Sequence, residues 1–162
     1  MKIREIIISW DTGFALIIAG VAFLLLPSQV AGAYAKDVYF VGITVLATIA
    51  PMFFAALAIV TSLSDNDFID FLEEDGTYTA LLQDFGYSLS IMLAILVVSI
   101  LLYFYTQYEL LNTSYIQPKM VVVSFLFGFS YALFAGFLAS NDAIKYLKYR
   151  TRFLSIKNKK NP

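Results

Sequence analysis

The chain has 162 residues, of which 60% are hydrophobic and only 14% are charged, and its mean hydropathy is +0.76. Soluble domains have about 45–50% apolar and about 25% charged residues, so this composition excludes an ordinary soluble domain and favours a membrane protein. The absence of cysteine and histidine excludes disulfides, thiolate nucleophiles and the commonest general base, and a net charge of −1 gives no overall attraction to nucleic acid.

Four apolar stretches predict transmembrane helices, because a helix needs about 20 apolar residues to cross the hydrocarbon core. The expected spans cover about residues 6–26, 38–63, 85–106 and 120–139. The first is short, so we extend it back to residue 6, which puts Trp10 and Asp11 near the lipid headgroups. A signal peptide is the alternative interpretation of this N-terminus, because Lys2 and Arg4 precede an apolar run.

The predicted architecture is one all-α membrane domain, residues 1–162, with the four helices in a bundle. Of the eleven Lys and Arg residues, two precede the first span and seven follow the fourth, so the positive-inside rule puts both termini in the cytoplasm, at the cell inner membrane. Because no charged residue is expected inside a span, an enzyme and a proton-coupled transporter are disfavoured. We predict no catalytic residue, no cofactor and no metal site.

Residues 64–84 form an acidic cytoplasmic segment between the second and third spans. We expect a short helix with the acids on one face and an apolar opposite face, made by Phe68, Ile69, Phe71 and Leu72. Asp75 and Gly76 should end it, and Thr77 should cap a second helix that runs into the third span. The simplest interpretation is that the apolar face lies on the membrane; a docking surface for a cytosolic partner is the functional alternative.

Residues 140–162 form a basic cytoplasmic tail, predicted to continue the fourth span as an amphipathic helix. Its charges fix the topology, and we expect some of them to pair with the acidic segment, within a subunit or between neighbours. Exposed pairs contribute only about 0–1 kcal/mol each. The predicted partner-docking residues come from both segments: Asp67, Phe68, Asp70, Phe71, Glu73, Glu74, Lys145, Lys148, Arg150 and Arg152.

Gly128, Ala132 and Gly136 recur at four-residue spacing in the fourth span, so they share one face of the helix. Small residues let helix backbones approach closely inside a bilayer, where this packing drives helix association. The face serves either packing within the subunit or contact between subunits. We expect a homo-oligomer that uses this face.

Two functions remain open. The favoured one is a non-enzymatic membrane sensor or anchor that recruits a cytosolic protein. The alternative is an oligomeric pore or membrane-depolarising effector, with a conduction path lined by some of the hydroxyl residues Thr44, Thr48, Ser90, Ser99, Ser124 and Ser130. We expect no direct binding of nucleic acid by either.

The join of the second span and the acidic segment resembles a known type of protein. The resemblance rests on residues 55–60, 64–72, 76–78 and 81–82, together with the layout of the spans. These stretches are similar to those of prokaryotic four-span membrane proteins associated with anti-phage defence, such as the membrane subunits of the Kiwa system. The resemblance implies a homotetramer, a soluble DNA-binding partner and a response to phage at the envelope. It implies no site at the level of single residues.

Overall fold

The computed structural model describes residues 10–62, 66–74, 76–112 and 115–160. Nearly all of them are helical, as the prediction of an all-α chain required, and two very short strands complete the set. In chain order the elements are α2 (Trp10–Leu25), β1 (Gln29–Ala31), α3 (Gly32–Ser62), α4 (Asn66–Glu73), α5 (Thr77–Asn112), β2 (Ile116–Pro118) and α6 (Lys119–Lys160).

Three helices of the described chain, α3, α5 and α6, are long and apolar enough to cross a membrane. The second, third and fourth predicted spans lie in these helices, apart from residue 63, which is outside the described residues. Their length and composition are consistent with an all-α membrane protein. The helix α2 has 16 described residues, which is shorter than an ordinary span, and residues 6–9 of the first predicted span lie outside the described part.

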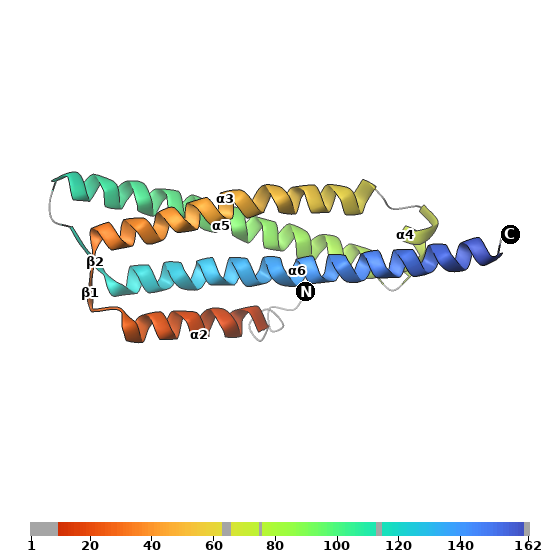
Figure 1. Cartoon of the computed structure of the whole chain (residues 1–162), viewed down its shortest axis with the longest axis horizontal. Helices are drawn as coiled ribbons and strands as arrows, with labels where there is room; N and C mark the ends of the chain where they lie inside the picture. The colour runs from red at the N-terminus through yellow and green to blue at the C-terminus, as the bar shows by residue number, and fades with distance from the viewer. Residues whose placement is uncertain (1–9, 63–65, 75, 113–114, 161–162) are drawn as a thin grey trace.

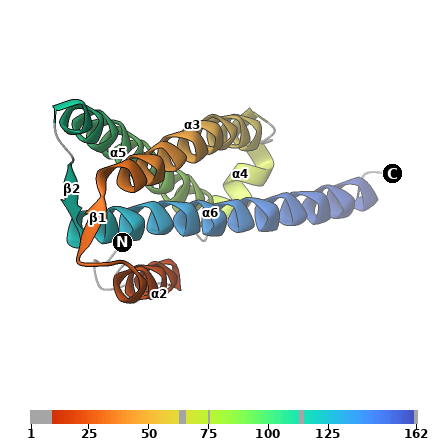
Figure 2. The same cartoon turned by 60° about the vertical axis from the view of Figure 1, so that its left-hand side comes forward.

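The helices pack against one another mainly as neighbouring pairs. The helix α3 packs along α5, and α5 packs along α6, whereas α2 makes its main contacts with α6 alone (Figures 1 and 2). The buried residues of α2 are Asp11, Ala15 and Ala19, one face at four-residue spacing. Because only this narrow face is made of small side chains, α2 approaches a single neighbour closely, and its large apolar residues stay exposed.

The core lies between α3, α5 and α6. Phe53 of α3 and Phe85 of α5 pack with ring centroids 5.2 Å apart, and Met92 and Ala132 continue the same cluster. A second cluster lies nearer β1 and β2, where the rings of Tyr39 and Phe125 meet edge to face at 4.9 Å. Gly42 permits this contact, because a Cβ there would come within 2.6 Å of the Phe125 ring.

The small-residue face of α6 is used inside the chain. Ala132 is fully buried, a Cβ on Gly136 would overlap the end of the Met92 side chain, and one on Gly128 would lie 2.8 Å from Ile95. These positions therefore hold α6 against α5 and α3, which is the intramolecular interpretation of the pattern. A contact between subunits through this face stays a prediction.

A two-stranded antiparallel pairing joins the connections at one end of the helices, with Val30 opposite Gln117. The Gly32 amide extends the contact by donating a hydrogen bond to the Tyr115 carbonyl at 3.0 Å. A Cβ on Gly32 would come within 2.8 Å of the same oxygen, so glycine permits the close approach. The prediction of a purely helical chain missed this pairing, because three-residue strands carry too little periodicity to detect.

Candidate functional site

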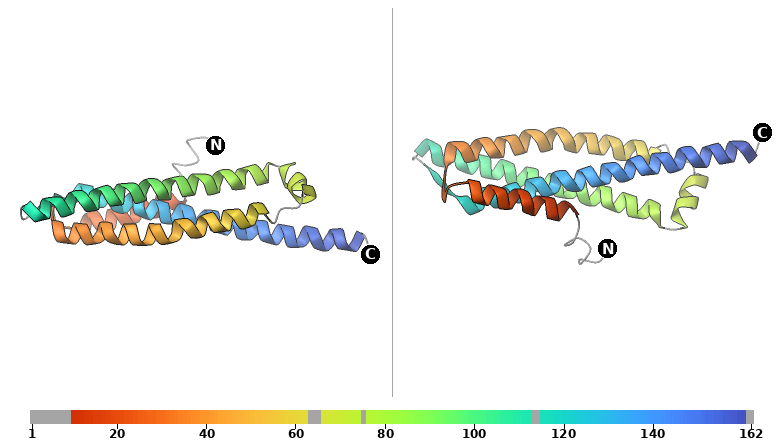
Figure 3. Two further views of the ribbon diagram at one scale, coloured as in Figure 1. Left: turned by 90° about the horizontal axis from the view of Figure 1, so that it is seen from above. Right: turned by 60° about the horizontal axis from the view of Figure 1, so that its bottom comes forward.

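At the opposite end of the molecule, α4, the start of α5 and the last part of α6 come together (Figures 1 and 3). The helix α6 is continuous for 42 residues, so the described part of the basic tail, residues 140–160, is helical and continues directly from the apolar stretch of residues 120–139. Gly76 has a positive φ of 68°, a conformation that glycine adopts without strain, and its amide donates to the Glu73 carbonyl at 3.0 Å. This turn directs α4 back against the other two helices.

An aromatic cluster fastens α4 to α6. The ring of Phe68 lies 5.3 Å from the rings of both Tyr146 and Phe153, and the ring of Phe71 lies 5.5 Å from Phe153. Tyr78 at the start of α5 adds a contact of 6.3 Å with Tyr146. Ring pairs at these separations contribute about 0.5–1.5 kcal/mol each beyond the burial of area. We call these five residues the aromatic clamp.

The clamp buries part of the apolar face of α4 inside the protein. Phe68 is fully buried and Leu72 is 6% exposed, because both pack into the core of the chain. The simplest sequence interpretation, that this face lies on the membrane, is therefore wrong for Phe68 and Leu72. Phe71, at 52% exposed, is the one large apolar side chain that the described part of α4 leaves open.

Glu73 links α4 to α5 through hydrogen bonds. Its carboxylate accepts from the Thr79 amide at 3.1 Å and from the Thr79 hydroxyl at 2.6 Å. The first amides of a helix have no partner within the helix, so this carboxylate caps α5 from outside. The helix begins at Thr77, as predicted. The sequence also predicted that the Thr77 side chain caps it, but the capping carboxylate belongs to Glu73.

The expected pairing of the acidic segment with the basic tail does not occur between described side chains. The ion pair in this region joins Lys145 to Asp142 at 2.7 Å, within α6. Because the apolar face of α4 is turned toward α6, its acids face away from the helix that carries the positive charges. The charges of residues 64–67, 75 and 157–160 lie outside the described side chains.

The predicted docking residues separate into four groups. Exposed positions that can meet a partner are Asp70, Phe71, Glu73, Glu74, Lys145, Lys148 and Arg152. Arg150 is half-buried, and within the described chain its Nε has no hydrogen-bond partner. Phe68 is turned inward and forms part of the clamp, so it is unavailable in this conformation, and the side chain of Asp67 lies outside the described part. Docking itself stays a prediction.

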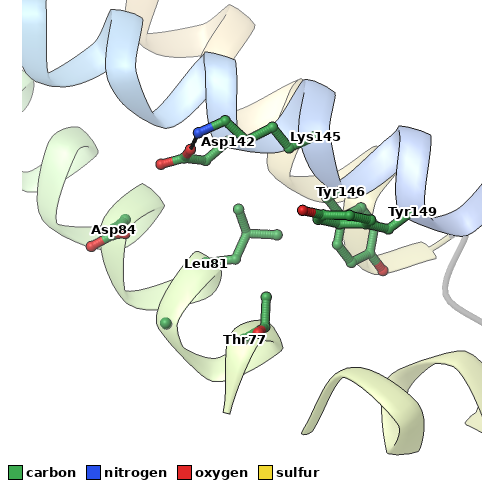
Figure 4. Close-up of a pocket in the computed structure, with 8 residues that line it drawn as sticks. Thr77, Leu81, Asp84, Asp142, Lys145, Tyr146 and Tyr149 are labelled. Atoms are coloured by element: carbon green, nitrogen blue, oxygen red, sulfur yellow. Dashed lines mark hydrogen bonds and ion pairs between the residues drawn. The ribbon is translucent and has the colours of Figure 1, made fainter. Parts of the chain in front are cut away.

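A groove of about 270 Å³ opens beside the clamp, between the start of α5 and α6 (Figure 4). Leu81 and Asp84 line it from α5, and Asp142, Lys145 and Tyr149 line it from α6. Burial, together with the nearby charge of Asp142, raises the pKa of Asp84 above its ordinary value. The hydrogen bond from Lys145 to Asp142 raises the pKa of the Lys145 ammonium. Sequence reasoning missed this groove, because its walls come from segments far apart in the chain.

A second polar group lies between α2, α5 and α6. The hydroxyls of Tyr87 and Tyr131 are hydrogen-bonded at 2.9 Å, and the Asp11 carboxylate is close enough to act electrostatically on Tyr131. Asp11 is 7% exposed and belongs to the first turn of α2, a helix whose beginning lies beside the middle part of α6 (Figure 1). The sequence predicted this residue near the lipid headgroups, and that placement stays a prediction; its burial against other helices was not predicted. The four-residue spacing of Asp11 and Ala15 could have predicted that Asp11 lies on the packed face of α2.

Comparison of the chain with protein-family models, with curated protein sequences and with solved structures gave no match. Among the residues that the structure describes, no group of three or more Asp or Glu side chains is placed to hold a metal ion. The groove, the clamp and the exposed charges are therefore the features on which a functional proposal rests.

Proposed function

We propose that this chain is a non-enzymatic sensor or anchor of the cell inner membrane that recruits a cytosolic protein, in prokaryotic antiviral defence. In this proposal it crosses the membrane four times with both termini in the cytoplasm, and it assembles as a homo-oligomer, with a tetramer implied by the resemblance. Its partners are the lipid bilayer, further copies of itself and a cytosolic protein, and no nucleic acid binds to it directly.

The aromatic clamp is the observation that carries the proposal. It packs α4 against the end of α6 beyond the apolar stretches, with Phe68 fully buried at its centre. The acids Asp70 and Glu74 and the bases Lys148 and Arg152 are left exposed, and no ion pair between described side chains joins the two sets. An exposed surface that carries both positive and negative charges can orient a partner, because complementary charges set the specificity and rate of association.

Partner capture by cross-linking in cells tests the recruitment. The double variant Asp70→Lys/Glu74→Lys reverses the charge of the exposed α4 surface without touching the clamp. We expect a specific cross-linked protein to be lost in this variant and retained in the control Asp37→Lys. The Asp37 carboxylate is exposed near the start of α3, at the end of the molecule that lies away from α4. Recruitment by this surface is rejected if the same protein is captured equally by all three.

The orientation has its own test. The chain has no native cysteine, so single cysteines placed at residues 74 and 152 are the only thiols in each variant. Both should react with a membrane-impermeant maleimide only after the cytoplasmic side is opened. Labelling of either thiol in intact cells rejects the proposed topology.

Fewer of the hydroxyl residues named for the pore alternative are available to line a path between subunits. Ser99 and Ser130 are buried within the chain, so they cannot line a path between subunits. Thr44 and Thr48 are exposed on α3, but each donates its hydroxyl to the carbonyl four residues earlier, at 2.9 and 2.7 Å. Expression of the chain alone should depolarise cells if it forms a pore and should leave the membrane potential unchanged if it is an anchor.

A further inference from the structure

The groove between α5 and α6 carries an excess of negative charge. Asp84 lies on one wall, and Asp142 and Lys145 lie on the other, so the groove holds two carboxylates and a single ammonium group (Figure 4). Lys145 is already engaged with Asp142 at 2.7 Å, and no ion pair between described side chains includes Asp84. The groove is therefore short of one positive charge.

The surroundings of Asp84 disfavour its charged form. Its pKa is raised first by burial and then by the charge of Asp142. A bound cation favours the charged form of such a carboxylate, because an opposite charge nearby counteracts the repulsion from Asp142. The groove thus favours a positively charged ligand at its α5 wall.

The position of the groove limits which class of molecule can supply that ligand. Asp84 directly precedes the apolar stretch of residues 85–106, and Asp142 follows the stretch of residues 120–139 by a few residues. In the membrane arrangement of the proposed function, both carboxylates lie at the level of the lipid headgroups. The ring of Tyr149, 53% exposed at the groove, belongs to a residue type enriched at this level.

We propose that this groove binds the headgroup of a zwitterionic phospholipid with a primary ammonium group, of the phosphatidylethanolamine class. The ammonium lies on Asp84 and the phosphate on Lys145, whose charge stands at the rim of the groove. The proposal rests on the membrane location of the proposed function and not on the recruited partner. A volume of about 270 Å³ suits a small headgroup, since pockets for drug-sized ligands span about 300–1,000 Å³.

Charge and hydrogen bonding separate this headgroup from other common ones. A primary ammonium has three N–H donors, and Lys145 on Asp142 already shows that contact in the groove. A trimethylammonium headgroup has no donor for Asp84. An anionic glycerol headgroup would add negative charge to a groove that already has an excess of it.

Native mass spectrometry of the full chain in detergent tests the proposal. Phosphatidylethanolamine, phosphatidylcholine and phosphatidylglycerol with identical acyl chains are titrated separately. The ethanolamine lipid should bind most tightly, and Asp84→Asn should weaken its binding about tenfold, as the loss of one charge-assisted hydrogen bond predicts. The matched control Asp37→Asn removes an exposed carboxylate near the start of α3, away from the groove, and should bind the lipid as the wild type does.

A second variant keeps the test independent of the charge of Asp84. Ala80 lines the groove, and Ala80→Leu fills part of the space with a strong helix former. It should abolish the preference for the ethanolamine lipid while circular dichroism shows the wild-type helix content. Soluble phosphorylethanolamine at the same concentration should not displace the lipid, because it lacks the acyl chains that add affinity.

Several outcomes overturn the proposal: equal binding of the ethanolamine and choline lipids, tighter binding of the glycerol lipid, unchanged binding in Asp84→Asn, or full displacement by soluble phosphorylethanolamine. None of them requires the cytosolic partner. Failure of lipid selectivity with intact partner capture therefore rejects the headgroup site alone, and the reverse result rejects recruitment alone.

Discussion

The ring of Phe68 lies 5.3 Å from the ring of Tyr146, although one residue belongs to α4 and the other to the far part of α6. Both are buried, at 0% and 3% exposed. This contact joins the acidic segment to the basic tail through apolar packing, where the sequence had predicted ion pairs. The two charged surfaces are thereby held together while their charges stay available to other molecules.

Phe68→Ala should release α4 from α6. Truncation of a buried Phe costs about 3–5 kcal/mol, because transfer energy is lost and a cavity remains. We expect faster amide hydrogen exchange in residues 140–156, measured by mass spectrometry, with little change in the apolar part of α5. Phe71→Ala is the control, since Phe71 is 52% exposed and should have a smaller effect. Equal effects of the two variants would contradict the account of the clamp.

Gly136→Ala should destabilise the chain itself. The added Cβ overlaps the end of the Met92 side chain, which must shift; because that side chain is flexible, we expect a cost near or below the lower end of the about 1–3 kcal/mol typical of overpacking. We expect a slightly lower midpoint of thermal unfolding in detergent, and the larger change Gly136→Leu should lower it further. Gly20→Ala, with nothing within 4 Å of the new Cβ, should have no such cost. If Gly136→Ala instead changes the oligomer mass without a loss of stability, the face lies between subunits.

Glu73→Ala should loosen the start of α5. It removes both hydrogen bonds to Thr79, and loss of a helix cap costs about 0.5–2 kcal/mol. Glu73→Gln should retain part of the stability, because its amide oxygen can still accept from the Thr79 amide. Glu74→Ala, at an exposed neighbouring position, serves as the control. Denaturant or thermal unfolding in detergent ranks the stabilities of these variants. Identical stability of Glu73→Ala and Glu74→Ala would show that the cap contributes nothing.

Tyr87→Phe and Tyr131→Phe should each remove the same hydrogen bond between α5 and α6. Each single change should cost about 0.5–1.5 kcal/mol, and the double variant should cost about as much as one of them. A double-mutant cycle on thermal unfolding measures this coupling. Simple additivity of the two changes would indicate that the hydroxyls act independently.

Asp84→Asn should raise stability at neutral pH in lipid-free detergent. The raised pKa means that the folded chain binds the Asp84 proton more tightly than the unfolded chain does. Stability therefore falls as the pH rises from the ordinary value of 3.8 through the folded pKa, and it stays lower above that range. Asparagine removes this loss, so the two proteins should converge at pH values well below 3.8. A neutral-pH midpoint that is lower in Asp84→Asn would contradict this sign.

The apolar helices could be predicted because hydropathy is a local property of the sequence. Three of the four predicted spans lie in long helices, and Thr77 begins α5 where the turn at Gly76 indicated. The continuous helix from Lys119 also followed from the chain alone. In each case the signal is a run of neighbouring residues whose composition or turn chemistry decides the local structure.

The site depended on contacts between distant segments. The four-residue spacing of Gly128 and Ala132 identified a packing face but could not distinguish a neighbouring helix from a neighbouring subunit. The alternation of acids and aromatics in α4 identified two faces but not which one would meet α6. The groove at Asp84 and Asp142 has no counterpart in local sequence at all.

Composition alone therefore determined that this chain is apolar, helical and without thiol or imidazole chemistry, because those properties belong to single residues and to short runs of them. The tertiary structure decided that Phe68 turns inward, that α2 packs on the outside of α6 and that two carboxylates face one another across a groove. These outcomes depend on which surfaces fit closely enough to exclude solvent, and that fit exists only once the helices have assembled.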